Sequence, residues 1–367
     1  MPVLLMVLAL SPALAAPARA AGQSLSLTTG LSTTYDDNIL QYSDTLLTVF
    51  DSGSKPTHFS IASKGDLVLN PSLALTWESD AGHGRRHALR LRGEGDFHDR
   101  NATADYRSVS VLWRESWARG RRLSLGWFTL PRYYLRQLFD EDLPLVPGQT
   151  RYRRATFRLQ IGTVSWDQRL TKNTDIGVGY RYEGRAYDDA FVERDANLHQ
   201  GELALGFNRL PARGSVDLEG GYRVSRAKAA DADEVPGVTP DDQDLSYSGF
   251  VAGVRGRAEL TRGKAWRLTG DVGYQLATRH FDSDRPADAN HFGRSDLLNA
   301  VEVGLRAHYR PHFSARGFFR HEDNAATMGP NARPTFDPGS YRVSQVGLSL
   351  EWSGEVWSRG AGGGDQE

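Results

Sequence analysis

The sequence contains no cysteine, and this absence removes several kinds of chemistry. Without a thiol the chain has no disulfide, no thiolate metal site and no cysteine nucleophile. A surplus of one charge is also lacking, because 44 basic and 45 acidic residues leave a formal net charge of −1 at pH 7. The composition therefore gives no electrostatic case for binding nucleic acid.

Long hydrophobic runs are missing as well. After residue 20 no stretch approaches the about 18 uncharged apolar residues that a membrane-spanning helix needs. The first twenty residues differ, because the apolar run "VLLMVLAL" precedes a small-x-small cleavage site at Ala18-Arg19-Ala20. This segment resembles a secretory signal peptide. The sequence therefore predicts a signal peptide over residues 1–20 and an exported chain without a helical membrane anchor.

Alternating polarity fills the rest of the chain. In "DLVLNPSLALTW" (66–77), Leu67, Leu69 and Leu73 fall on one side while Asp66 and Asn70 fall on the other. Successive side chains of a β-strand point to opposite faces, so the pattern predicts a strand with one apolar face. The same pattern recurs and predicts fourteen strands, at residues 24–35, 66–78, 87–98, 106–117, 121–134, 151–162, 174–187, 198–208, 214–226, 246–260, 264–278, 297–310, 312–322 and 341–352.

The connections between these strands alternate in length. Short turns such as "TRG" (261–263) alternate with long segments at 36–65, 99–105, 135–150, 188–197, 227–245, 279–296 and 323–340. The connection at residues 163–173 falls at a position where a short turn is expected, but it is longer than the other short turns. An even number of strands with short turns at one end and long loops at the other is typical of bacterial outer-membrane barrels.

Aromatic residues collect at the strand ends. Those expected at the short-turn edge are Trp77, Trp113, Phe207, Trp266, Tyr309 and Trp352, and those expected at the opposite edge are Tyr35, Phe97, Tyr133, Tyr182, Tyr222 and Phe319. Amphipathic rings at two lipid–water interfaces produce such girdles. A secreted β-sandwich or β-solenoid also alternates, but it has no need for aromatics or loops sorted in this way.

The segment "VGLSLEW" (346–352) closes the last predicted strand. Gly347, Leu350 and Trp352 resemble the C-terminal insertion signal of outer-membrane barrels, which the barrel-assembly machinery reads. "TTYDDNIL" (33–40) is similar to the start of several outer-membrane barrel families. "FSARGFFRHEDNAA" (313–326) with "YRVSQVGLSLEW" (341–352) resembles the barrel of surface lipoprotein assembly modifiers. The domain prediction is thus a barrel over 21–352 and a polar tail over 353–367.

The polar face of the strands is rich in arginine. The residues expected to line the lumen and contact solute are Arg90, Arg92, Arg132, Tyr134, Arg136, Arg154, Arg158, Arg181, Arg185, Arg255, Arg257, Arg306, Arg316 and Arg320. Fourteen strands enclose a lumen wide enough for water, and guanidinium groups favour anions or sugar-like solutes. Carboxylates such as Glu94, Glu183 and Glu302 share this face. The arginines therefore either form a selective conduit or pair with the carboxylates as structure, and both readings stay open.

The sequence offers only weak candidates for catalytic or metal-binding motifs. No G-x-S-x-G occurs, and "AELTRGKA" (258–265) lacks the first glycine and the final Ser/Thr of a phosphate-binding loop. His308 and His312 flank a turn, so their spacing carries little weight. Asp96, His98 and Ser108 have no spacing that marks an outer-membrane hydrolase. The acidic stretches 231–244 and 282–290 do not fit the known calcium loop. We therefore expect no enzyme activity, no metal and no cofactor.

These observations together favour an all-β, transmembrane, antiparallel up-and-down barrel in the outer membrane of a Gram-negative bacterium. The expected function is a passive or weakly selective channel for small polar solutes, anionic or sugar-like. The alternatives are the barrel component of an exopolysaccharide or surface-lipoprotein export system, an outer-membrane enzyme and a non-conducting structural barrel. The expected partners are outer-membrane lipid and lipopolysaccharide, the barrel-assembly machinery, small polar solutes and, for the alternative, export components, but not nucleic acid.

Overall fold

The fold is known from a computed structural model, which describes residues 22–140, 146, 150–231, 243–285, 288, 290–327, 329 and 339–359. The predicted signal peptide and most of the acidic stretch 231–244 lie outside these residues. Fourteen strands dominate: β1 (Gly22–Asp36), β2 (Asp66–Gly82), β3 (Arg85–His98), β4 (Tyr106–Trp117), β5 (Arg121–Phe139), β6 (Tyr152–Arg169), β7 (Thr174–Tyr187), β8 (Ala196–Leu210), β9 (Gly214–Ala227), β10 (Tyr247–Arg262), β11 (Trp266–Phe281), β12 (Ser295–Tyr309), β13 (Phe313–Thr327) and β14 (Tyr341–Arg359).

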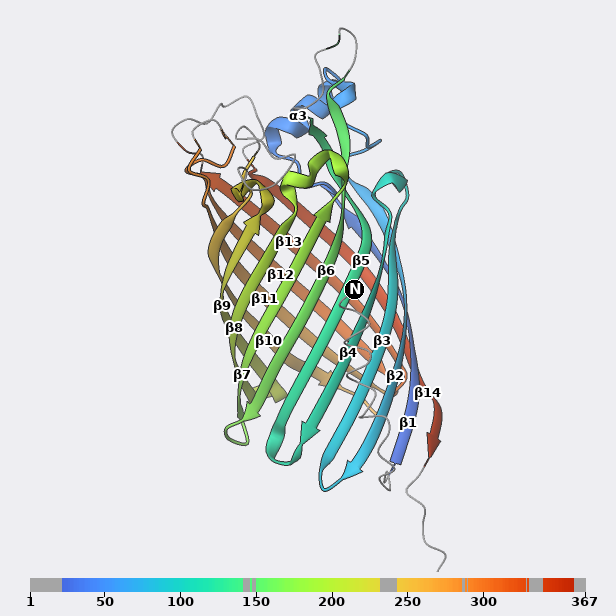
Figure 1. The fold of residues 1–367 in the computed structure, drawn as a ribbon. Coiled ribbons are helices and arrows are strands. Elements are labelled where there is room, and N and C mark those ends of the chain that lie inside the picture. Colours follow the sequence, from blue (N-terminus) through green and yellow to red (C-terminus); the bar gives the residue numbers. More distant parts are fainter. Residues whose placement is uncertain are drawn as a thin grey trace, which may run out of the picture.

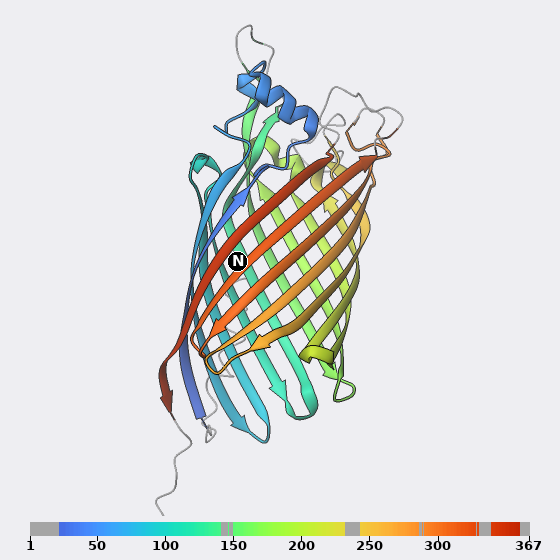
Figure 2. The ribbon, with the colours of Figure 1, turned by 180° about the vertical axis from the view of Figure 1, so that it is seen from behind.

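The strands form one closed antiparallel barrel. Each strand pairs with its neighbours in the chain, and β1 pairs with β14 to close the circle, with Leu31 opposite Leu350. Figures 1 and 2 show the strands tilted around the barrel, with the start of β1 and the end of β14 at the end that carries the short turns. The predicted fold class and all fourteen predicted strands are confirmed.

The largest differences from the predicted strand boundaries are at the ends of β6 and β14. The awkward segment 163–173 is mostly strand, because β6 continues to Arg169 and leaves only 170–173 as a turn. The boundary between barrel and tail at residue 352 is wrong, because β14 continues to Arg359, which pairs with Gln23. An irregularity in the β1–β14 register at Leu25/Ser26 leaves Val356 as an extra residue of β14 and shifts the alternation there. The apolar positions therefore change phase there, and the pattern that marks the strand is broken.

The barrel is apolar outside and polar inside. Leu73 of β2, Leu203 of β8 and Leu348 of β14 are 52%, 63% and 55% exposed on the outer surface. A water-soluble protein would bury such side chains, whereas a transmembrane barrel presents them to lipid. None of the helices in the described ranges is long and apolar enough to cross a membrane.

Exposed aromatic side chains lie near both edges of the apolar surface. At the short-turn edge they include Trp266, Tyr309 and Trp352 of the predicted set, and β14 adds Trp357. Near the long loops Tyr35, Tyr182, Tyr222 and Phe319 are exposed as predicted. Tyr133 does not belong to this girdle, because it contacts Tyr106 and Phe157 on the inner side. Its place in the predicted girdle was wrong because a bulge in β5 shifts the alternation just before it.

The connections between the strands contain short helices. In the described residues these are the α-helix α3 (Asp44–Ser52) and the 3₁₀ helices η1 (Pro56–His58), η2 (Ala102–Ala104), η3 (Ala118–Gly120), η4 (Asp189–Arg194), η5 (Pro211–Arg213) and η6 (Lys228–Asp231). Ser43 caps the start of α3, because its hydroxyl accepts a hydrogen bond from the Leu46 N–H, and Gly53 caps the end with φ 63°. Such caps satisfy backbone groups that a helix end leaves unpaired. Figure 1 shows α3 at the end of the barrel with the long connections.

The loop that carries α3 has its own small core. Leu40, Tyr42 and Leu46 pack with Ala104 of η2 and Tyr134 of β5. Asn38 ties the base of the loop, because its amide donates to the carbonyls of Tyr42 (2.8 Å) and Arg342 (3.0 Å). The loop is therefore an ordered part of the barrel mouth.

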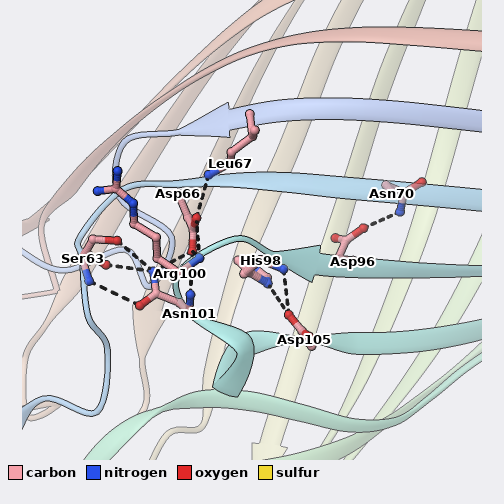
Figure 3. A network of polar contacts seen from close by, with 9 residues as sticks. All are labelled: Ser63, Asp66, Leu67, Asn70, Asp96, His98, Arg100, Asn101 and Asp105. Atoms are coloured by element: carbon pink, nitrogen blue, oxygen red, sulfur yellow. Dashed lines mark hydrogen bonds and ion pairs between the residues drawn. The ribbon is translucent and has the colours of Figure 1, made fainter.

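A second anchor holds the far end of this loop (Figure 3). The buried carboxylate of Asp66 accepts hydrogen bonds from the backbone N–H groups of Arg100 and Asn101 and from the Asn101 side chain at 2.7–3.1 Å. The side-chain oxygen Oδ1 of Asn101 in turn accepts from the N–H groups of Ala62 (2.7 Å) and Ser63 (3.3 Å). Two adjacent loops are thereby locked together at the rim.

Asp66→Ala would leave the three donors on Arg100 and Asn101 without their acceptor. Burying unpaired donors costs about 1–3 kcal/mol, so we expect segment 37–65 to open more often while the barrel stays folded. Trypsin cleavage at Lys55 and Lys64 of the refolded protein measures this opening. Asp51→Ala, which removes only the exposed ion pair with Lys64, is the control. Equal cleavage rates in the two variants would show that the Asp66 anchor is not needed.

Candidate solute-binding site

Many of the predicted lumen arginines pair with carboxylates inside the barrel. Arg316 of β13 donates to Asp271 at 2.8 Å and to Glu302 at 2.6 Å. Arg320 binds Glu322 at 2.7 Å, and Arg92 binds Glu94 at 2.7 Å. In this part of the wall the charges neutralise each other, as the structural reading of the sequence expected.

Nearer the long loops, fewer of the arginines are paired directly with carboxylates. The side chains of Arg185, Arg223 and Arg279, from β7, β9 and β11, line one cavity of about 320 Å³ together with Tyr247. The guanidinium carbons of Arg223 and Arg279 each lie 5.5 Å from the Tyr247 ring centroid. We call these three arginines the throat cluster.

Only one member of the throat cluster is neutralised directly. Arg185 shares the carboxylate of Glu183 with Arg181, at 2.7 and 2.8 Å. Arg223 donates to the carbonyl of Thr278 at 3.2 Å, while its buried Nε has no hydrogen-bond partner. Among the described residues no carboxylate forms an ion pair with Arg223 or Arg279. The same cavity is also lined by Arg181 and by three glutamates, Glu183, Glu202 and Glu219. Four arginines against three carboxylates leave one net positive charge that an anion is able to neutralise.

Above the throat lies a vestibule of about 1010 Å³. Its basic lining residues outnumber the acidic ones by six to two: Lys55, Arg136, Arg185, Arg194, Arg279 and Arg294 against Asp288 and Asp296. Tyr133, Phe157 and Phe281 add aromatic surface. Arginine beside aromatic rings binds carboxylate groups and the apolar faces of sugar rings in one site.

The vestibule arginines are held in place from several loops. Arg136 donates to the carbonyl of Leu40 at 3.1 Å and lies 5.1 Å from the Tyr42 ring. Arg194 at the end of η4 donates to Gln243 at 2.7 Å. Burial lowers the pKa of Arg194 from its ordinary value, and a guanidinium nevertheless stays charged at neutral pH. These positions are therefore fixed before any solute arrives.

A buried histidine–aspartate pair supports the same wall. The Nδ1 of His291 lies 3.0 Å from a carboxylate oxygen of Asp288, which also accepts from the N–H of Asp244 at 2.9 Å. Burial lowers the pKa of His291, although the hydrogen bond to Asp288 opposes this. Burial would raise the pKa of Asp288, but the hydrogen bond and the charge of His291 hold it below its ordinary value.

Four of the predicted lumen residues lie elsewhere. Phe157 and Leu159 of β6 line the vestibule, so Arg154 and Arg158, at positions of the opposite phase, face outward and are exposed. Arg132 lies in a register shift of β5 and is also exposed. Tyr134 is buried under the loop of α3, with its hydroxyl hydrogen-bonded to Ser60. The prediction failed here because β6 carries apolar residues on both faces and β5 contains two bulges.

The other predicted arginines lie on the inner side. By the strand register these are Arg90, Arg92, Arg181, Arg185, Arg255, Arg257, Arg306, Arg316 and Arg320, and Arg136 reaches the vestibule. Whether they contact solute stays a prediction. Sequence reasoning missed Arg194, Arg279 and Arg294, which lie beyond the predicted strand ends, and left Arg223 out of the solute-contacting set. No local pattern distinguishes them from ordinary loop arginines.

The residues considered for hydrolysis do not assemble. Ser108 donates to Glu94 at 3.3 Å, and His98 is hydrogen-bonded to Asp105. Asp96 accepts from Asn70 (Figure 3). No serine–histidine pair forms among them, and within the described ranges no three metal-binding side chains gather.

Comparisons with known proteins add little to this picture. No family model and no curated protein matches the chain. Solved structures with a similar course include a bacterial polysaccharide outer membrane secretin (11% identity, 90% of this chain and 98% of that chain, TM-score 0.45). They also include an anion-selective porin from Comamonas acidovorans (11%, 90% and 99%, 0.41) and a loop-deletion mutant of an outer membrane protein of Vibrio cholerae (9%, 91% and 100%, 0.42). At these values the likeness carries no argument about function, which has to come from the chain's own residues.

The His291–Asp288 pair makes its loop sensitive to acid. The folded-state pKa of His291 is below the ordinary 6.5, so the unfolded loop binds the proton more readily and stability falls as the pH drops below about 6.5. The depressed pKa of Asp288 adds a further loss in stronger acid. We expect hydrogen exchange in 282–294, corrected for its intrinsic rate, to speed up between pH 8 and pH 5.5.

His291→Gln should abolish most of this pH dependence, and His83→Gln, in the exposed β2–β3 turn, should not. If the loop exchanges at the same corrected rate at both pH values, its stability does not depend on the His291–Asp288 pair.

Proposed function

We propose that the protein is an outer-membrane channel for small polar solutes, with a preference for anions set by the throat cluster. The observation that carries this proposal is that Arg223 and Arg279 lie inside a barrel of fourteen strands and form no direct ion pair with a carboxylate of the described residues. Pore walls select ions by the charge and the donors that they present. The aromatic lining of the vestibule extends the expected solutes to carboxylated sugars and similar amphipathic anions.

Barrel size supports conduction in place of a filled core. Eight strands enclose only enough space for side chains, whereas larger barrels leave a ligand cavity or an aqueous channel. Separate cavities of about 390 and 320 Å³ remain inside the barrel beside the paired arginines such as Arg316. A fully charge-paired structural barrel would have no reason to keep two unpaired arginines in its throat.

The first test is single-channel recording with residues 21–367 refolded in detergent and inserted into planar bilayers under asymmetric salt. We expect discrete conductance steps and a reversal potential displaced toward anions. In water, a unit charge at about 4 Å is worth about 1 kcal/mol, which is a factor of about five in local anion concentration. Arg223→Gln with Arg279→Gln should therefore lower the anion-to-cation permeability ratio several-fold.

Arg132→Gln with Arg158→Gln is the matched control, because it removes the same number of charges from the outer surface. The control should leave selectivity unchanged. A folded barrel that stays silent in the bilayer overturns the channel proposal. It then favours the structural barrel or an export component that opens only with its partner.

Glu183→Gln tests the neutralisation within the throat. The substitution removes the carboxylate that Arg181 and Arg185 share, so the local charge rises by one unit. We expect the anion preference to increase, again by up to about fivefold. Glu115→Gln, which lies on the outer surface against Arg85, is the control. A decrease in anion preference would mean that Glu183 holds the arginines in their conducting positions.

A further inference from the structure

Three arginines lie side by side on the outer surface of β4, β5 and β6. Arg107 follows Tyr106, which pairs with the inner-face residue Asp96, so Arg107 points outward. Arg132 lies between Leu130 and Tyr133, and both of those residues line the vestibule. Arg158 lies between the vestibule residues Phe157 and Leu159. All three arginines are exposed, and we call them the outer arginine row.

The strand register brings these positions to one level. The last printed pair between β4 and β5 is Val109 with Thr129, and two residues further along are Arg107 and Pro131. In the β5–β6 ladder, Pro131 and Arg132 together face the single residue Arg158, because the register shifts between Leu130 and Tyr133. Proline has no N–H to give to the ladder, and a bulge re-aims the neighbouring side chain. The bulge therefore turns Arg132 outward beside Arg158.

The row lies at the outer edge of the apolar surface. The Arg107 guanidinium is 5.9 Å from the ring of Phe97. Arg158 lies four residues beyond Gly162, the partner of the exposed Tyr182, in the direction of the long loops. An arginine facing lipid costs about 2–4 kcal/mol at the middle of a bilayer but about 0–1 near an interface. The row is thus at the depth of lipid headgroups.

These charges have no neutralising partner among the residues that the structure describes. In the described part of the chain, no carboxylate forms an ion pair with Arg107, Arg132 or Arg158. By contrast, Arg85 at the opposite edge of the outer surface pairs with the buried carboxylate of Glu115. Three adjacent guanidinium groups repel one another unless an anion lies between them. That anion has to come from outside the chain.

We propose that the outer arginine row binds the phosphate groups of a phosphorylated glycolipid in the outer leaflet, the class to which lipopolysaccharide belongs. Neighbouring strands are about 4.8 Å apart, so two guanidinium groups are able to share one phosphate through paired hydrogen bonds. Arg154 is exposed and forms no ion pair with any described carboxylate, and it extends the basic surface toward the loops. This inference rests on the outer-membrane location in the proposed function, but not on conduction.

The test compares lipid binding by the detergent-solubilised protein and by the variant with Arg107→Gln, Arg132→Gln and Arg158→Gln. The probes are purified lipopolysaccharide, the same lipid after chemical dephosphorylation, and inorganic phosphate. We expect the triple variant to bind lipopolysaccharide at least about tenfold more weakly. The dephosphorylated lipid should bind the unmodified protein as weakly as lipopolysaccharide binds the variant.

Arg223→Gln with Arg279→Gln, inside the lumen, should bind lipopolysaccharide as the unmodified protein does. Equal binding by the triple variant overturns the proposal, as does equal binding of the dephosphorylated lipid. Inorganic phosphate that binds as tightly as the lipid also overturns it, because the row would then be a site for the free ion. Lipid binding is measured without current, so a silent channel leaves this result unaffected, and loss of lipid binding leaves the channel proposal standing.

Discussion

The backbone pairing of β1 with β14 is the constraint on which the rest of the molecule depends. A lone sheet edge in lipid would expose N–H and C=O groups that nothing satisfies, so only a closed sheet is stable there. Closure also fixes an inside and an outside for every strand. Gly347 of β14 shows how tight this seam is, because a Cβ there would meet the Phe318 ring at 2.5 Å and the Thr34 hydroxyl at 2.9 Å. Once the seam is closed, alternation alone decides which side chains face lipid and which face the lumen.

The two bulges of β5 are departures from that alternation, and they lie beside the vestibule. Below them β5 places Trp127 outward and Phe128 inward; between them Tyr133 faces inward and Tyr134 lies under the loop of α3. The extra residues bend the β5–β6 hairpin and provide a surface on which the α3 loop packs. The bulged part of β5 therefore forms part of the vestibule wall and is the surface on which the α3 loop packs. It also turns Arg132 toward the outer surface of the barrel.

Strand positions follow from the sequence because period-two alternation depends on single residues and their neighbours. It is harder to derive from the sequence which of the two alternating sets of side chains in a strand faces lipid. In β6, Val164 and Trp166 occupy one face while Phe157, Leu159 and Ile161 occupy the other, so hydrophobicity does not say which set meets lipid. The register with β5 and β7 decides it, with Leu125 and Val178 opposite Val164 and Trp166. The throat cluster is harder still, because Arg185, Arg223 and Arg279 come from three strands that meet only after closure.

The pairing of charges distinguishes arginines that stabilise the lumen wall from arginines that are available to a solute. Burying a charge is costly unless a partner neutralises it, and Arg316 meets that condition with two carboxylates. Arg223 and Arg279 do not, yet they lie against Tyr247 in the same barrel. Two cations that form no direct ion pair among the described residues destabilise the empty throat, and an anion that enters reduces this cost. An anion that neutralises charge in a wide, hydrated lumen is held weakly, and weak holding is what transit requires. A dedicated binding pocket would instead enclose its ligand, which the open vestibule above the throat does not do.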